Sequence, residues 1–111
     1  MRETLARTAR FQERVFTKRE RDYCAQRGAV AAQHYAARFA AKEAVLKALG
    51  TGWRDGIAWH DVEVANEESG KPYLLITGKA REVYDSLGVV AAHLSLSHTA
   101  EHAIAQVVLE K

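Results

Sequence analysis

The sequence predicts an α+β fold in which a long buried helix packs on a small, mainly antiparallel sheet. Helical patterns occupy the first half of the chain, and alternating strand patterns come mostly later, which is typical of α+β proteins rather than of alternating βαβ units. The chain has 111 residues, 48% of them hydrophobic and 27% charged. This length and composition predict one folded domain over residues 1–111.

Three helices are predicted before the first strand. The first runs through Phe16 and carries a row of arginines near one face. Thr17-Lys18-Arg19-Glu20 has the form of a capping box, so a second, short helix starts there. Gly28 interrupts the pattern, and the longest helix follows over residues 30–49. Gly50 is expected to close that helix as a left-handed C-cap.

Four strands and a further helix are predicted in the second half. Alternation predicts the first strand, and a polar segment with Gly and Pro at 66–72 predicts the turn of a hairpin. A polar connection likewise joins the last two strands. The predicted elements are the strands 57–64 and 73–77, the helix 78–87, and the strands 89–97 and 103–109.

Composition excludes several functional classes. No apolar run approaches the ~20 residues that cross a bilayer, and the first residues lack the apolar core of a signal peptide. We therefore expect a cytoplasmic protein without membrane contact. Cys24 is the only cysteine, so no internal disulfide and no thiolate cluster for zinc are possible.

The charge is unevenly distributed, although the net charge is only +2. Residues 1–21 hold seven basic and three acidic side chains, a balance of +4, and the remainder sums to −2. A basic leading segment predicts a docking surface for an acidic partner, either a protein or a nucleic acid. The structural alternative is a solvated helix face.

Four ionic residues lie on the alanine-rich long helix: Arg38, Lys42, Glu43 and Lys47. A helix that is apolar nearly all round is a buried helix, so these ions must be paired or bound. Glu43 and Lys47 are spaced as in a simple helix ion pair. Because Gly50-Thr51-Gly52 follows, we favour a phosphate-handling site, with Lys47 on a phosphate and Glu43 on a metal ion. The glycine loop lacks the P-loop spacing.

The segment from His93 to His98 places His93, Ser95 and Ser97 on one side of a strand, a candidate polar surface. Nucleophilic catalysis is disfavoured, because no Gly-x-Ser-x-Gly elbow accompanies these serines. Zinc binding by His98 and His102 is disfavoured too, because they lie at a predicted turn.

Taken together, these segments resemble the holo-acyl-carrier-protein synthases, the small class of 4′-phosphopantetheinyl transferases. The likeness runs from about Arg10 to the C-terminus, in the family's order and spacing. The matching segments are 38–44 (RFAAKEA) with Lys47, 50–52 (GTG), 70–73 (GKPY), 93–98 (HLSLSH) and 105–108 (AQVV). The resemblance implies the fold of that transferase class.

The resemblance also implies a reaction, in which the phosphopantetheine arm of coenzyme A passes to a serine of apo acyl carrier protein with magnesium on the pyrophosphate. Adenosine 3′,5′-bisphosphate is the other product, and the reaction serves fatty acid biosynthesis. Glu43 is implied as the magnesium ligand and catalytic residue, and Lys47 as the catalytic pyrophosphate clamp. The implied coenzyme contacts are Lys42, Lys47, Gly50, Thr51 and His98.

The basic leading segment gains a partner from the resemblance. Acyl carrier proteins are strongly acidic, and Arg7, Arg10 and Arg14 fall where the family's carrier-docking helix lies. The family also implies a homotrimer with sites between subunits and no nucleic-acid partner.

The sequence departs from the family at its start, where a Gly-x-Asp strand supplies a second magnesium carboxylate. Two alternatives therefore stay open: a shortened relative that only binds carrier protein or coenzyme A, and a small nucleic-acid binder.

Overall fold

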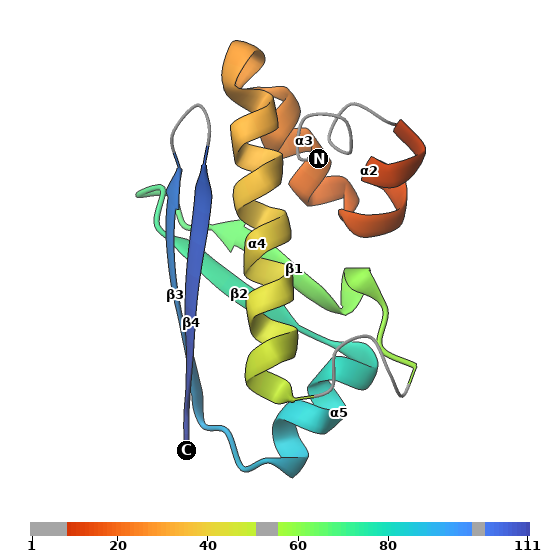
Figure 1. Cartoon of the computed structure of the whole chain (residues 1–111), viewed down its shortest axis with the longest axis vertical. Helices are drawn as coiled ribbons and strands as arrows, with labels where there is room; N and C mark the ends of the chain where they lie inside the picture. Colours follow the sequence, from red (N-terminus) through yellow and green to blue (C-terminus); the bar gives the residue numbers. More distant parts are fainter. Residues whose placement is uncertain (1–8, 51–55, 99–101) are drawn as a thin grey trace.

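The computed structural model describes residues 9–50, 56–98 and 102–111 (Figure 1). Its helices are α2 (Ala9–Val15), α3 (Lys18–Ala25), α4 (Ala31–Leu49) and α5 (Gly78–Ser86), with short 3₁₀ turns η1 (Gly28–Val30) and η2 (Trp59–Asp61). Its strands are β1 (Val62–Asn66), β2 (Pro72–Ile76), β3 (Ala91–His98) and β4 (Ala103–Glu110). The predicted α+β class is confirmed.

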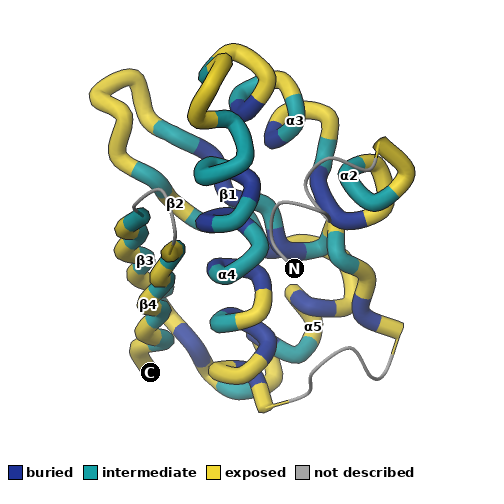
Figure 2. The backbone as a smooth tube through the Cα atoms, turned by 45° about the horizontal axis from the view of Figure 1, so that its top comes forward, coloured by how far each residue is buried: buried dark blue, intermediate teal, exposed yellow. Residues whose placement is uncertain are grey.

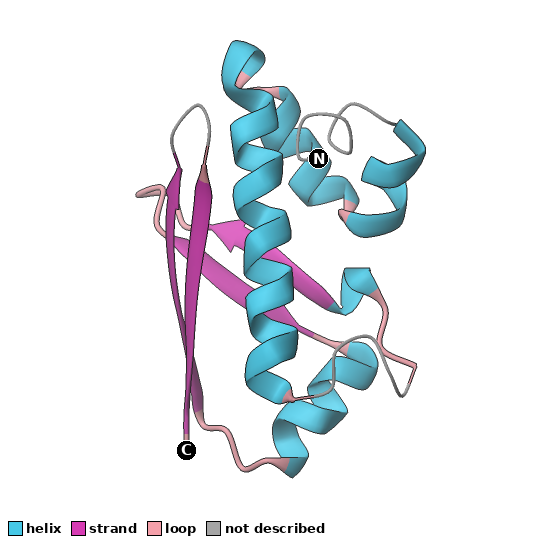
Figure 3. Cartoon of the chain, in the orientation of Figure 1, coloured by secondary structure: helices cyan, strands magenta, loops and turns pink. Residues whose placement is uncertain are grey.

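The described strands form two antiparallel hairpins (Figure 3). In the first, β1 pairs with β2 from Val62 opposite Ile76 to Asn66 opposite Pro72. In the second, β3 pairs with β4 from Ala91 opposite Glu110 to His98 opposite Ala103. The two hairpins meet where β2 lies close to β3, but no hydrogen-bonded ladder joins them among the described strands.

Helix α4 runs between the β3–β4 hairpin and the pair α2 and α3 (Figure 1). Most of its positions are buried or half-buried, as expected for the long helix (Figure 2). Its exposed residues are Glu43, Lys47 and Ala48. The buried positions are Tyr35, Ala37, Arg38, Ala41, Lys42, Val45, Leu46 and Leu49.

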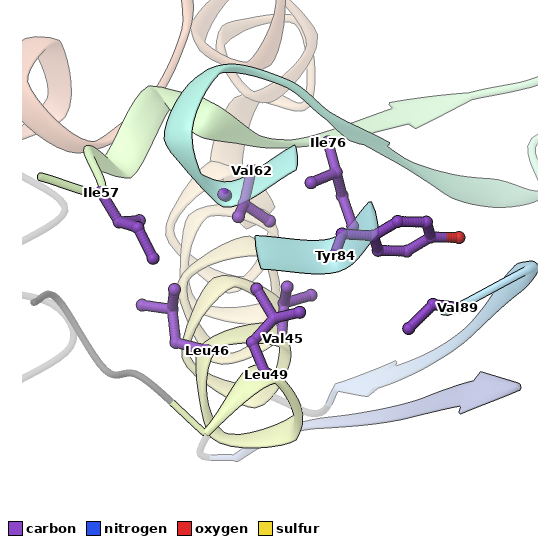
Figure 4. Close-up of a cluster of buried hydrophobic side chains, with 9 residues drawn as sticks. Val45, Leu46, Leu49, Ile57, Val62, Ile76, Tyr84 and Val89 are labelled. Atoms are coloured by element: carbon purple, nitrogen blue, oxygen red, sulfur yellow. The ribbon is translucent and has the colours of Figure 1, made fainter. Parts of the chain in front are cut away.

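The C-terminal half of α4 supplies Val45, Leu46 and Leu49 to the larger apolar core (Figure 4). Burying each such side chain stabilises the fold by about 1.5–3 kcal/mol. The other members are Ile57, Val62, Ile76, Ala80, Tyr84 and Val89. No helix in the described part of the chain is long and apolar enough to cross a membrane.

A second apolar cluster lies under α2 and α3 and consists of Val15, Phe16, Cys24 and Tyr35. Phe39 packs against this cluster, its ring stacked on Trp59 with centroids 5.2 Å apart and tilted on Phe11 at 5.8 Å. Because Phe39 lies one turn before Glu43, helix α2 is anchored next to the middle of α4.

Local signals in the sequence gave the correct helix ends. The Glu20 amide donates to Thr17 Oγ1 at 3.2 Å, and the Thr17 amide donates to Glu20 Oε1 at 2.9 Å, which confirms the capping box. Gly50 has φ 79°, the predicted left-handed cap.

The first predicted strand is wrong at its start, because β1 begins at Val62 rather than at residue 57. Residues 59–61 form η2 instead, and Asp61 Oδ2 accepts the Ala58 amide at 3.1 Å. This hydrogen bond from the Ala58 amide to the Asp61 side chain favours a 3₁₀ turn over a strand, and the alternation of apolar residues does not reveal it.

Candidate functional site

Glu43 and Lys47 are the exposed ions of α4. Since they are one helical turn apart, both side chains project from the same side of the helix. Neither has a hydrogen bond or ion pair with another described residue, so the simple ion pair considered from sequence does not form among them. A carboxylate and an ammonium are therefore left available to ligands on one face.

Lys42, their neighbour, is enclosed. Its side chain has 0% exposure, and Nζ lies 2.9 Å from Glu20 Oε1. The ammonium also donates to the carbonyl oxygens of Trp59, at 3.1 Å, and of Val62. Burial lowers the pKa of Lys42, and the Glu20 carboxylate opposes that shift. All three N–H donors are used internally, so the expected coenzyme contact at Lys42 is corrected to a structural role.

Glu20 is a structural residue that sequence reasoning only half recognised. The capping box identified its local role, but its other oxygen, Oε2, accepts the Val64 amide at 2.8 Å. Through Thr17, Lys42 and Val64 the one carboxylate ties α3 to α4 and β1. No local sequence pattern predicts that Glu20 contacts Lys42 and Val64, which are distant in the chain.

Arg38 is the second buried ion, with 2% exposure. Its guanidinium donates to Asn66 Oδ1 and lies 4.1 Å above the Tyr23 ring, while its buried Nε has no partner. Beside it is a cavity of about 140 Å³. The lining residues are Arg19, Tyr23, Arg38, Val64, Ala65, Asn66 and Tyr73. Two guanidinium-bearing side chains and two phenol rings make this an opening suited to an anion with an attached ring.

His98 lies on the inward side of β3, against the start of α4. Its Nδ1 is 3.1 Å from Gln33 Oε1, and its ring centroid is 4.7 Å from that of His34. The alternation predicted for this strand is confirmed, because His93, Ser95 and Ser97 are exposed on the opposite face. The structure therefore brings His98 alone of this polar segment to the helix.

Three further residues join His98 and Arg38 in a cluster that sequence reasoning did not assemble. The Tyr23 and His34 rings pack edge to face, with their centroids 5.6 Å apart. The Arg27 guanidinium lies over the Tyr23 ring, 3.9 Å from its centroid. These residues come from α3, the following loop, α4 and β3, so no spacing rule connects them. They are Tyr23, Arg27 and His34.

The ions of α4 do not converge on one cleft within this chain. At about 100° per residue, Arg38 and Glu43 are rotated by about 140° around the helix, and His34 and Glu43 by about 180°. The Arg38–His98 cluster and the Glu43–Lys47 pair thus face different sides. The four ionic residues that the sequence places on α4 are therefore divided between two sides of the helix and its buried interior.

The remaining predicted residues are distributed over the surface or lie outside the description. Arg10 and Arg14 are exposed on α2, and Gly50 is exposed where α4 ends. Arg7 and Thr51 lie outside the described residues.

Comparison with known proteins identifies the class to which this combination of fold and ionic helix corresponds. The profile of the 4′-phosphopantetheinyl transferase superfamily matches residues 1–107, and the chain belongs to that superfamily. It is 51% identical over 105 residues to the holo-[acyl-carrier-protein] synthase of Geobacter metallireducens, covering 95% of this chain and 82% of the relative. It is 53% identical over 97 residues to the holo-[acyl-carrier-protein] synthase of Trichlorobacter lovleyi, covering 87% of this chain and 76% of the relative.

Solved structures agree. A holo-(acyl-carrier-protein) synthase from Bacillus anthracis in complex with CoA (3′,5′-ADP) has a TM-score of 0.74 and 40% identity, covering 91% of this chain and 80% of that one. The Helicobacter pylori synthase in complex with coenzyme A has a TM-score of 0.82 and 26% identity, covering 98% and 90%. The resemblance inferred from the sequence is confirmed.

Proposed function

We propose that this chain is a holo-acyl-carrier-protein synthase. It transfers the 4′-phosphopantetheine group of coenzyme A to a serine of apo acyl carrier protein, giving holo carrier protein and adenosine 3′,5′-bisphosphate. The observation that carries this proposal is the pair Glu43 and Lys47 on α4. Both are exposed, lie one turn apart and have no partner among the described residues, in a chain that is 51% identical to a synthase of that name.

The coenzyme offers two kinds of phosphate, and the chain offers two cationic places for them. Lys47 is assigned to the pyrophosphate, as a point charge at the reacting end. The cluster of Arg38 and His98 is assigned to the phosphate on the ribose, supported by the unpartnered buried Nε of Arg38. Gly50 and Thr51, directly after α4, are assigned as backbone contacts to the coenzyme.

The opposed directions of the two half-sites support a homotrimer with the coenzyme bound between subunits. Arg38 and His98 of one copy would face Glu43 and Lys47 of its neighbour. The outer face of the β3–β4 hairpin carries exposed apolar side chains, Ile104 at 65% and Val108 at 51%, which a neighbouring copy would cover. Closed rings of identical contacts are the usual form of such assemblies.

Subunit mixing tests this arrangement. Arg38→Gln and Glu43→Gln should each be inactive alone, and co-refolded mixtures should regain activity at about a quarter of their sites, because only one pairing in four carries both intact halves. Mixtures that stay inactive while native mass spectrometry shows heteromers would place the whole site in one subunit.

The Glu43 side fits magnesium. This ion takes one or two carboxylates, substrate phosphates and several waters, and Glu43 presents an exposed carboxylate without a competing partner among the described residues. Glu43 would hold the ion, which when bound neutralises charge on the pyrophosphate.

The residues of the chain then act by positioning and by charge. The carrier serine oxygen attacks the phosphorus that bears the pantetheine arm, and the bond from that phosphorus to the bridging oxygen breaks. Lys47 stabilises the negative charge that develops on the departing adenosine 3′,5′-bisphosphate. Glu43 accepts the serine proton, directly or through a water held on it. The half-site at Arg38 keeps the departing nucleotide aligned.

The carrier protein is assigned to α2. Arg10 and Arg14 are exposed there, and α2 is anchored through Phe11 and Phe39 one turn before Glu43. Arg7 would extend the row. We further propose that the enzyme acts in the cytoplasm in fatty acid biosynthesis, with neither nucleic acid nor membrane as a partner.

The decisive experiment incubates the protein with coenzyme A, magnesium and apo acyl carrier protein, and measures the carrier mass. We expect the phosphopantetheine mass gain with the wild type, and a rate reduced about 100-fold or more in Glu43→Gln. Glu82→Gln, an exposed carboxylate on α5, is the matched control and should stay active. Coenzyme binding without any mass gain would instead support a protein that only binds, and a fully active Glu43→Gln would remove our site assignment.

A further inference from the structure

Three cationic or titratable side chains contact Tyr23 near the start of α4, and a fourth contacts one of these three. The Arg27 and Arg38 guanidinium groups lie over the ring at 3.9 and 4.1 Å. The His34 ring meets the Tyr23 ring at 5.6 Å and the His98 ring at 4.7 Å. Helices α3 and α4 and the loop between them thus place two guanidinium groups and one imidazole against one phenol, and strand β3 places a second imidazole against the first.

None of the five residues of this cluster is acidic. Neither arginine is ion-paired there, and the buried Arg38 Nε has no hydrogen-bond acceptor. Helix α4 also begins nearby, and its first turn contains no acidic residue to offset the positive end of the helix dipole. Arg38 donates to the neutral amide oxygen of Asn66, which leaves its buried charge without a neutralising anion, so the cluster is suited to receive one.

The surroundings of His34 favour its neutral form in the free protein. Its pKa lies below the ordinary value of 6.5, first because the ring is partly buried and then because positive charge surrounds it. The neighbours that lower this pKa, in order of effect, are His98, Arg38 and Arg27. Tyr23 contributes a ring contact. An anion that entered the cluster would reverse the sign of the local potential.

We propose that His34 is an additional phosphate-binding residue that takes up a proton when the ribose phosphomonoester of the coenzyme binds at this cluster. The inference rests on the proposed function, which makes coenzyme A the substrate. A phosphomonoester carries a charge near −2 at neutral pH. The imidazolium can donate hydrogen bonds to its oxygens from either ring nitrogen, whereas the neutral ring can donate from only one, which the tautomer determines. The protein therefore binds the coenzyme more tightly as the pH falls, and it discriminates against a coenzyme that lacks this phosphate.

The test reads the proton on His34 directly. Histidine ring resonances of the wild type, assigned by triple-resonance spectroscopy, are titrated by NMR without ligand, with coenzyme A and with dephospho-coenzyme A. We expect coenzyme A to raise the pKa of His34 by about one unit or more, a tenfold change in proton affinity, and dephospho-coenzyme A to leave it in place. This measurement needs no substitution in the cluster.

Calorimetry supplies the second arm. Between about pH 8 and about pH 6, the affinity of the wild type for coenzyme A should rise about threefold or more beyond that of His34→Gln, because the titration of the ligand itself is common to both proteins. His60→Gln is the matched control, since a glutamine amide still donates to the Glu13 carbonyl oxygen that His60 contacts at 2.8 Å. It should follow the wild type.

The outcomes separate this inference from the proposed function. Coenzyme binding with an unchanged or lowered His34 pKa overturns the role of His34 and leaves the transferase proposal intact. An equal pKa rise with dephospho-coenzyme A overturns the assignment to the phosphomonoester. Failure of coenzyme A to bind at any pH overturns both.

Discussion

The Glu20 carboxylate and the Lys42 ammonium form an ion pair 2.9 Å long that has no exposed surface. Every remaining donor and acceptor of the pair is used: Glu20 caps α3 and accepts from β1, and Lys42 donates to two backbone carbonyls. These hydrogen bonds offset the desolvation penalty of burying the two charges in a low-dielectric interior. It also explains why Lys42 is unavailable to ligands although Glu43, the next residue, is exposed.

Breaking this pair should be costly. We expect Glu20→Gln to lower the free energy of unfolding by about 3–5 kcal/mol, because the Lys42 charge loses its partner and stays buried. Urea denaturation followed by circular dichroism measures the change. Asp22→Asn removes the exposed pair with Lys18 and should change stability by less than about 1 kcal/mol. Equal effects of the two substitutions would contradict the assignment.

Gly78, at the start of α5, is a position where adding a single side-chain carbon should destabilise the fold. It has φ +58°, and a Cβ there would lie 2.6 Å from Asp61 Oδ1. Gly78→Ala combines left-handed strain with this clash and should destabilise by about 2–4 kcal/mol. Gly88→Ala has similar strain, at φ +76°, with nothing within 4 Å, and should cost about 1–2 kcal/mol. Thermal unfolding of both variants isolates the contribution of the clash.

Carrier docking should depend on the charge of α2. Arg14→Glu should raise the KM for acyl carrier protein about 5–10-fold, with kcat for bound carrier nearly unchanged, because it replaces attraction by repulsion at a surface contact. The effect should shrink in about 0.5 M salt as the charges are screened. Lys79→Glu makes the same charge change on α5, away from α2, and should leave the KM unaltered (Figure 1). A matching rise in that variant would point to overall charge rather than to α2.

His34 should make the fold sensitive to acid. Its folded pKa is below the ordinary 6.5, so the unfolded chain binds more protons once the pH approaches that value from above. Stability is therefore complete above about pH 7 and declines as the pH falls through the window below the unfolded pKa. Urea unfolding at about pH 7 and about pH 5 should show a smaller loss for His34→Gln than for the wild type. Identical losses would mean that His34 is not held neutral.

Several features follow from residues close together in the sequence, and these were predictable. The capping box of Thr17 and Glu20 spans one turn, and the Gly50 cap needs only its own backbone freedom. The β1–β2 turn was predictable from its Gly and Pro, and the segments 38–44 and 93–98 were sufficient to indicate the family. The start of β1 was not, because a side-chain contact of Asp61 within η2 outweighed the apolar alternation.

The sequence by itself determined the order of elements, the helix caps and the family. Only the tertiary structure decided which ions of α4 are enclosed and which are free: Lys42 is matched by Glu20, Arg38 rests on Tyr23, and Glu43 and Lys47 meet no described partner. The reason is physical. Whether a charge is buried, and what compensates it, depends on groups that chain folding brings from distant positions, and a helical wheel contains no information about those groups.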